Sequence, residues 1–179
     1  LDLITRSTKR LDLILSELID LTRLNKSQLA LQELNMEKII DEIVSSLKHL
    51  PKADKITYQK SFQLDRPLVS DIKLIHSIIQ NLTVNAINYH NFDQETPKIT
   101  FSVIRKGEYA AISVKDNGIG IPLRLQNRVF EMFYRGNTQS KGSGLGLYIV
   151  KSAVDRLKGE IDLESEEGKG TQITIRIPQ

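Results

Sequence analysis

Apolar residues recur at heptad spacing over the first 25 residues of the chain. The pattern predicts one helix over residues 1–25 with a single apolar seam. The seam positions are Ile4, Ser7, Leu11, Ile14, Leu18 and Leu21. An isolated helix of this length is marginal in water, so the seam needs a partner. Two alternatives stay open, a helix packed on its own domain and a coiled coil or four-helix bundle between chains, and the heptad repeat favours the second.

The remaining pattern predicts helices and β-hairpins that follow one another in blocks, after a mixed, linker-like stretch over residues 25–34. Helices are expected at 36–50, 71–89, 123–131 and 144–158, and strands near 55–63, 99–103, 110–114, 161–163 and 173–177. Asn35 and Asp71 (or Ser70) are expected to cap two of the helices, and Gly159 to end the last one. Because strands and helices do not alternate regularly, the order predicts an α/β two-layer sandwich, an antiparallel or mixed sheet with helices on one face.

Composition narrows the classes of function. The 179 residues suit one domain, or one domain with a short appendage. The absence of cysteine excludes disulfides, thiolate metal sites and a cysteine nucleophile. A net charge of +3, with 25 basic residues offset by 22 acidic ones, argues against nucleic acid as a partner. No apolar run approaches about 18 residues and no signal peptide is visible, so no membrane contact by this segment is expected. Because the first residue is Leu1 rather than methionine, we expect the sequence to be a fragment of a longer protein.

Three asparagines lie on one face of the helix expected at 71–89. Asn81, Asn85 and Asn88 have offsets of four and three residues, which places them in one stripe. Asparagine is a poor helix former, and its amide oxygen can ligate Mg²⁺ when phosphates and water supply the other ligands. The alternative is a set of polar residues at the edge of a buried face.

A glycine-rich loop follows the strand expected at 110–114. Asp116 has the strand parity of Ile112 and Val114, so its carboxylate points inward. A buried carboxylate needs donors, and an adenine amino group is one of them. Gly118 and Gly120 allow a ligand ring to approach the backbone. The alternative is a turn with a structural aspartate.

A second glycine-rich loop leads into the helix expected at 144–158. Backbone N–H groups at a helix N-terminus form a phosphate-binding arrangement. The spacing matches neither the dinucleotide-binding pattern, because Leu147 stands at the third glycine position, nor the P-loop. Ahead of this loop, Phe130 and Phe133 are expected to anchor its start and Arg135 to reach a phosphate, unless the two aromatics are simply core residues.

Taken together, these segments resemble the ATP-binding catalytic domain of sensor histidine kinases. The resemblance rests on the N box (81–89), a first glycine box (116–122), the F box (130–135), a second glycine box (142–147) and a small third one (168–171). It implies the Bergerat fold, which is shared with gyrase B, Hsp90 and MutL. It also implies ATP and Mg²⁺ as cofactors, held between the N-box helix and a lid at about 131–143.

The resemblance implies a role for each matching residue. Asn85 is the Mg²⁺ ligand, and Arg135 and Lys141 are lid-region cations near the terminal phosphates; these three form the catalytic group. Asp116 accepts the hydrogen bond from the adenine amino group. The other nucleotide contacts implied are Asn81, Asn88, Tyr89, Gly118, Gly120, Ile121, Gly142, Ser143, Gly144, Leu145, Gly146, Leu147 and Thr171.

Two departures from the family pattern bear on activity. Asn88 stands where the N box usually has a lysine, which removes a charged phosphate contact unless Lys115, Arg135 or Lys141 compensates. The second departure concerns the phosphate acceptor, because none of the three histidines (His49, His76 and His90) lies on the heptad helix. We therefore expect residues 1–28 to be the second helix of the family's dimerisation hairpin, without the acceptor helix, and residues 29–179 to be the catalytic domain.

The expected function is the ATP side of a two-component sensor histidine kinase. The resemblance implies transfer of the γ-phosphate to a histidine on the missing helix, a homodimer through the N-terminal helix in the parent protein, a response regulator receiver domain as partner and a cytoplasmic location. One alternative is a non-kinase ATPase of the gyrase–Hsp90 class, against which stand the F box and Asn81 in place of a catalytic glutamate. The other is a degenerate kinase acting as a regulatory scaffold, which Asn88 motivates and the glycine boxes oppose.

Overall fold

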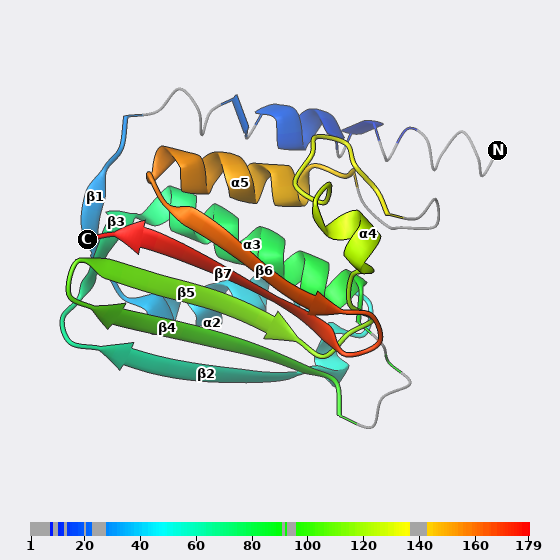
Figure 1. The fold of residues 1–179 in the computed structure, drawn as a ribbon, viewed down its shortest axis with the longest axis horizontal. Coiled ribbons are helices and arrows are strands. Elements are labelled where there is room, and N and C mark those ends of the chain that lie inside the picture. The colour runs from blue at the N-terminus through cyan, green and yellow to red at the C-terminus, as the bar shows by residue number, and fades with distance from the viewer. Residues whose placement is uncertain are drawn as a thin grey trace.

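The chain folds into a sheet with helices packed on one face (Figure 1). The computed structural model describes residues 8, 11–12, 14–19, 21–22, 28–90, 92, 96–136 and 143–179. The five-stranded sheet has the order β2-β4-β5-β7-β6. Its strands are β2 (Thr57–Leu64), β4 (Lys98–Lys106), β5 (Tyr109–Asp116), β7 (Gly170–Pro178) and β6 (Glu160–Glu166). Only β2 and β4 pair in parallel, so the expected mixed, mostly antiparallel sandwich is confirmed.

Three helices cover the inner face of this sheet. They are α2 (Met36–Ser46), α3 (Ile72–Asn88) and α5 (Gly146–Arg156), with a short 3₁₀ turn η1 (Ala53–Lys55) and α4 (Leu123–Gln126) at the periphery. The sheet buries Ile99, Phe101 and Val103, each at most 1% exposed, against helix residues such as Ile75 and Ile78 of α3. Each such side chain contributes about 1.5–3 kcal/mol when fully buried, so α3 is held firmly on the sheet.

Asp71 connects the start of α3 to a small second sheet. Its Oδ1 accepts hydrogen bonds from Lys73 N (2.9 Å) and Leu74 N (3.2 Å), which confirms it as the N-cap. Its Oδ2 accepts from Ala30 N at 2.9 Å. This contact lies beside β1 (Leu31–Leu34), which pairs antiparallel with β3 (Leu68–Asp71). The linker expected at 25–34 is therefore wrong for 31–34, because an exposed four-residue strand paired across a long sequence gap shows no alternating pattern.

Other predicted boundaries differ for local reasons. The helix expected at 36–50 ends at Ser46, and the one expected at 123–131 is confined to α4. Gly159 does not supply the left-handed residue after α5, because Lys158 adopts that conformation with φ 55°. Gly159 is required instead for close packing, since a Cβ there would lie 2.5 Å from the carbonyl oxygen of Arg176.

The N-terminal segment lies along α5 (Figure 1). Its described residues from 11 to 22 are helical. Ile14, Leu18 and Leu21 pack against Leu145, Tyr148 and Ile149 at the start of α5. These seam positions thus meet the chain's own domain, the first of the two alternatives. Leu11, a predicted seam position, and the neighbouring Leu15 and Ile19 are 43–65% exposed, and Ile4 and Ser7 lie outside the described residues.

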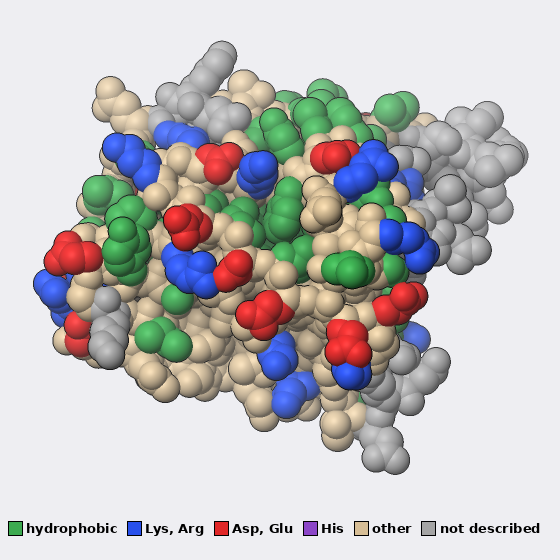
Figure 2. Space-filling view, in the orientation of Figure 1, with side chains coloured by type: hydrophobic (Ala, Val, Ile, Leu, Met, Phe, Trp, Pro, Cys, Tyr) green, Lys and Arg blue, Asp and Glu red, His purple; other side chains and the backbone are tan. Residues whose placement is uncertain are grey.

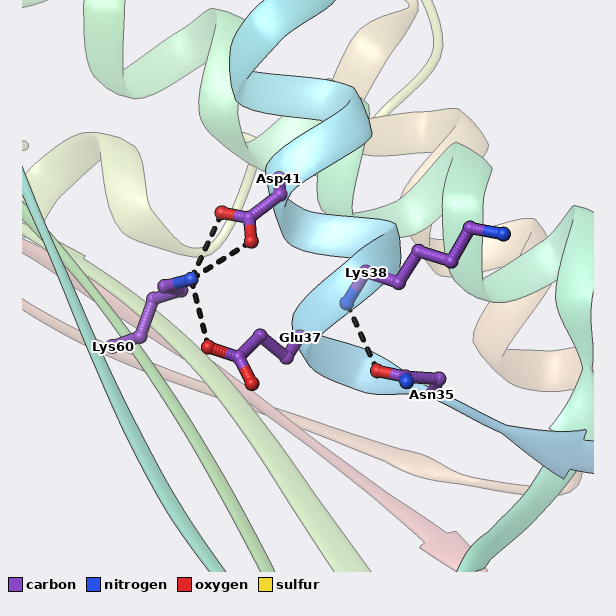
Figure 3. A network of polar contacts seen from close by, with 5 residues as sticks. All are labelled: Asn35, Glu37, Lys38, Asp41 and Lys60. Carbon is purple, nitrogen blue, oxygen red and sulfur yellow. Dashed lines mark hydrogen bonds and ion pairs between the residues drawn. The ribbon is translucent and has the colours of Figure 1, made fainter.

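The edge strand β2 carries an inward-pointing charge (Figure 3). Lys60 Nζ donates hydrogen bonds to Asp41 (2.9 and 3.0 Å) and to Glu37 (3.2 Å) on α2. In the same view Asn35 caps α2, its Oδ1 accepting from Lys38 N at 3.0 Å. A lysine on the inner face of an edge strand opposes pairing with a foreign strand. Lys60 therefore protects the open edge while fixing α2 on the sheet.

The face of the molecule seen in Figure 2 mixes both signs of charge, with basic and acidic side chains interspersed among neutral ones. None of the helices in the described part of the chain is long and apolar enough to cross a membrane.

Replacing Asp71 tests the junction of α3 with β1. We expect Asp71→Ala to lower the free energy of unfolding by about 1–2 kcal/mol, because it removes both the cap and the bond to Ala30. Asn35→Ala, which removes a single exposed cap bond, is the matched control and should cost about half as much. The measurement is urea unfolding of both variants. Equal losses would show that the Ala30 contact adds nothing to the cap.

Candidate functional site

A cavity of about 800 Å³ lies between α3, the end of β5 and the start of α5. Its walls include residues from all five of the predicted boxes, which are far apart in the sequence. The predicted residues that line it are Asn81, Asn85, Asn88, Tyr89, Asp116, Gly120, Ile121, Arg135, Ser143, Gly144, Gly146, Leu147 and Thr171. The fold therefore brings most of the candidate residues into one space.

The polar stripe of α3 forms one wall of the cavity. Asn81 Nδ2 donates a hydrogen bond to Ser77 O at 2.8 Å, which fixes the orientation of the amide. A Cβ on Gly146 would lie 3.2 Å from Asn81 Oδ1 and 3.7 Å from both amide atoms of Asn85. The first residue of α5 is thus packed directly against two of the asparagines, which brings helix N–H groups and amide oxygens together.

The N-terminus of α5 is open to an anion. Its N-cap, Leu145, makes no side-chain capping bond, and its first turn holds no acidic residue. Ser143 Oγ accepts a hydrogen bond from Leu145 N at 3.0 Å, which shapes the loop without capping the helix. Gly144 has φ 83°, and a Cβ there would lie 2.8 Å from the carbonyl carbon of Phe133. A helix N-terminus carries about half a positive charge, so this end of the cavity attracts phosphate.

Asp116 occupies the opposite end of the cavity. Its side chain lies on the inner face with Val114, as its strand parity predicts. Oδ1 accepts hydrogen bonds from Gly118 N (2.8 Å) and Thr171 N (3.3 Å), whereas no described residue donates to Oδ2. Burial raises the pKa of the Asp116 carboxyl above its usual value, and the two backbone donors offset part of that rise. The second oxygen is available to a ligand with an N–H donor.

The glycines of the loop after β5 serve close backbone packing. A Cβ on Gly120 (φ 68°) would lie 2.0 Å from Glu166 O, and one on Gly118 would lie 2.6 Å from Tyr89 O. The chain's own backbone therefore fills the space that the sequence analysis reserved for a ligand ring. Gly120 still lines the cavity, whereas Gly118 is buried beneath it.

Several predicted residues lie elsewhere. Leu145 is fully buried against the N-terminal helix. Phe133 is 49% exposed, so it does not anchor the lid as a core aromatic. Lys115 is exposed on the outer face of the sheet, where it cannot compensate for Asn88. Lys141 and Gly142 lie outside the described residues.

The cavity also contains residues that the sequence analysis missed. Leu50 and Val84 extend its apolar wall, and Arg124 and Glu167 place opposite charges in its lining. Glu17 reaches it from the N-terminal helix. No local pattern marks these residues, because only the tertiary packing brings them to the cavity. Among the described residues, no group of three histidines and carboxylates is arranged to hold a metal.

The fold and this cavity are those of a nucleotide-binding domain. Residues 70–179 match the family of histidine kinase-, DNA gyrase B- and HSP90-like ATPases. This match covers more than half of the chain, so the chain belongs to this family, and it corresponds to the ATP-binding catalytic part of a sensor histidine kinase.

Individual relatives agree with this assignment. The chain is 29% identical over 173 residues to the sensor histidine kinase RcsC of Escherichia coli K12, covering 92% of this chain and 18% of RcsC. It is 34% identical over 180 residues to the sensor-like histidine kinase SenX3 of Mycolicibacterium smegmatis, covering 95% of this chain and 45% of SenX3. The fold matches full-length ShkA in complex with AMPPNP with a TM-score of 0.75 at 20% identity, over 90% of this chain and 34% of ShkA. The chain thus spans less than half the length of each.

The raised pKa of Asp116 predicts that this carboxylate destabilises the nucleotide-free protein at neutral pH. A group with a raised folded-state pKa favours folding at low pH and loses that contribution as pH rises through the folded value. We therefore expect Asp116→Asn to raise the free energy of unfolding at pH 7, because an amide oxygen can keep both backbone bonds. The gain should shrink as pH falls towards 4. Urea unfolding of the wild type and the variant between pH 7 and pH 4 measures this difference in the free energy of unfolding. A difference that does not change with pH would contradict a raised pKa of Asp116 as its cause.

Proposed function

We propose that this chain binds ATP with one Mg²⁺ and forms the phosphate-donating half of a sensor histidine kinase. The observation that carries the proposal is the placement of Asp116, the asparagine stripe and the open N-terminus of α5 around one cavity. One end offers a hydrogen-bond acceptor for a base, and the other offers positive potential for phosphates.

Asp116 recognises the adenine in this proposal. Its Oδ2 accepts a hydrogen bond from the exocyclic amino group, while Oδ1 stays bonded to Gly118 and Thr171. Leu50, Val84 and the other apolar wall residues enclose the ring. A guanine would present a carbonyl oxygen to the same carboxylate, so the site favours adenine.

The phosphates lie against the start of α5 in this proposal. The N–H groups of the first turn donate to them, and Arg135 adds a cation in the wall. Asn85 supplies an amide oxygen to Mg²⁺, with Asn81 beside it. Mg²⁺ usually takes few protein ligands and keeps water and phosphate oxygens, so one amide is sufficient.

The reaction transfers the γ-phosphoryl group to an imidazole nitrogen of the partner helix. A bond forms between that nitrogen and phosphorus, the bond to the β-phosphate oxygen breaks, and ADP leaves. Positioning and charge stabilisation carry most of such a transfer. The acceptor lies outside this chain in our proposal, because His90 is only 7% exposed, His76 lies within α3, and His49 Nδ1 is 2.7 Å from Ser46 O.

Partners and location follow from the same proposal. The exposed stripe of Leu11, Leu15 and Ile19 is available for the homodimer contact of the parent protein. The phosphorylated histidine then serves a response regulator receiver domain on the cytoplasmic side. Residues 1–28 belong to the dimerisation hairpin, and residues 29–179 form the catalytic domain.

A hydrolytic ATPase of the gyrase–Hsp90 class is less consistent with the geometry. Such an enzyme needs a carboxylate base on the N-box helix, where this chain has Asn81. The Asn81 amide cannot accept a proton from water, and it is held by Ser77 O. Asn88 remains the one observation that favours a degenerate scaffold.

Calorimetric titration with AMPPNP and Mg²⁺ tests the proposal. We expect one-to-one binding by the wild type and a loss of about tenfold to a hundredfold in Asp116→Asn, because a hydrogen bond to a charged group contributes about 1.5–3 kcal/mol. Lys115→Gln is the matched control, since it removes a charge from the neighbouring residue on the other face of the sheet. No binding at millimolar nucleotide would favour the scaffold.

A substitution at Asn88 is expected to strengthen nucleotide binding, whereas Asp116→Asn weakens it. Restoring the charge with Asn88→Lys should tighten AMPPNP binding by about tenfold, the low end of a charged hydrogen bond. The same titration measures it, with Asn88→Gln as the uncharged control of similar length. Unchanged affinity would mean that Arg135 and the lid already neutralise the phosphates.

A further inference from the structure

The N-terminal helix places a carboxylate in the nucleotide cavity. Glu17 lines this cavity, and its Oε2 is fully buried. Its position relative to Ile14, Leu18 and Leu21 puts all four on one helix face. That face is the one that packs against Leu145, Tyr148 and Ile149, so docking of the helix on α5 carries Glu17 into the cavity.

Glu17 enters from the phosphate end. Leu145, which the helix contacts, is the N-cap of α5 and is followed by Gly146, the residue packed against Asn81 and Asn85. Asp116, which would hold the base, lies on the opposite wall at the end of β5. Since the first turn of α5 has no acidic residue of its own, Glu17 brings in a negative charge where the helix end attracts one.

A carboxylate at this place opposes the binding of a longer phosphate chain. Both groups are attracted to the same helix N-terminus and to Arg135, and they repel each other in a cavity where the effective dielectric constant is about 20 instead of about 80. The repulsion rises with the number and charge of the phosphates. ADP ends one phosphate earlier and carries less charge, so it meets less of this repulsion.

We propose that Glu17 is a specificity-determining residue that disfavours ATP relative to ADP while the N-terminal helix is docked on α5. The inference rests on the proposed function, because it concerns the phosphate end of the same site. Binding is reciprocal, so ATP must in turn weaken the docking of the helix. The γ-phosphate would thereby control whether the N-terminal helix lies on the catalytic domain or is released for other contacts.

The test compares Mg²⁺–AMPPNP with Mg²⁺–ADP in calorimetric titrations of the 179-residue chain. We expect Glu17→Gln to tighten AMPPNP by three- to tenfold and ADP by less than twofold. Asp12→Asn is the control, since it removes an acidic charge from an exposed position of the same helix. An unchanged AMPPNP-to-ADP ratio in Glu17→Gln, or weaker AMPPNP binding, would overturn the inference.

A second variant separates charge from docking. Leu18→Ser removes an apolar contact with α5 and should produce the same preference for AMPPNP, and the gains of Leu18→Ser and Glu17→Gln should not add. Hydrogen exchange supplies a readout other than affinity. AMPPNP should increase exchange in the N-terminal helix of the wild type, and ADP should not. Additive gains, or a helix protected by AMPPNP, would contradict competition between Glu17 and the phosphate.

Failure of the proposed function gives a different result. In that case neither nucleotide binds the wild type, Asp116→Asn changes nothing, and the proposal for Glu17 falls as well. If Asp116→Asn weakens nucleotide binding as expected while Glu17→Gln leaves both affinities unchanged, only the inference about Glu17 is wrong.

Discussion

The packing of α3 on the sheet and alongside α5 is the constraint on which the rest of the structure depends. One face of this helix buries Ile75, Ile78 and Ile79 completely, and a neighbouring stripe carries Asn81 and Asn85 to the cavity. Because the two stripes belong to one rigid helix, burial of the isoleucines also fixes where the amides point. Gly146 then lets α5 approach those amides closely. Core packing and ligand geometry are therefore set by the same contacts.

The cavity gathers groups that contribute little to stability by themselves. An uncapped helix end and a carboxylate with a raised pKa both carry an energetic penalty in the nucleotide-free protein. The apolar cluster around Phe101 and Ile112 offsets this penalty. A nucleotide would satisfy both groups at once, the base at Asp116 and the phosphates at α5. Groups that are placed for a ligand and destabilise the ligand-free protein in this way are typical of functional sites.

The sequence predicted the parts of the structure that local rules control. The apolar period and the cap at Asp71 located α3, and strand parity located Asp116 on the inner face. The pairing of β1 with β3 could not be predicted, because four mostly exposed residues carry no alternation and their partner lies more than 30 residues away. The sequence correctly indicated that position 118 needs a glycine, but for another reason than a ligand ring. Glycine is needed there because the backbone passes close to Tyr89 O, which only the folded chain shows. In the sequence, nothing distinguishes Glu17 from other polar residues of a helix, because only the packing of the N-terminal helix on α5 brings it into the cavity.

The place of β7 in the sheet bears on the order in which the domain can assemble. This last strand lies between β5 and β6, so the hairpin of β6 and β7 must dock on β5 before the sheet is continuous. Gln179 adds to this closure, exchanging two hydrogen bonds with the backbone of Val69. Thr171, which donates to Asp116, also comes from β7. During synthesis, the Asp116 end of the cavity is therefore completed only after β7 has formed, so a ligand held there would not help the earlier strands to fold.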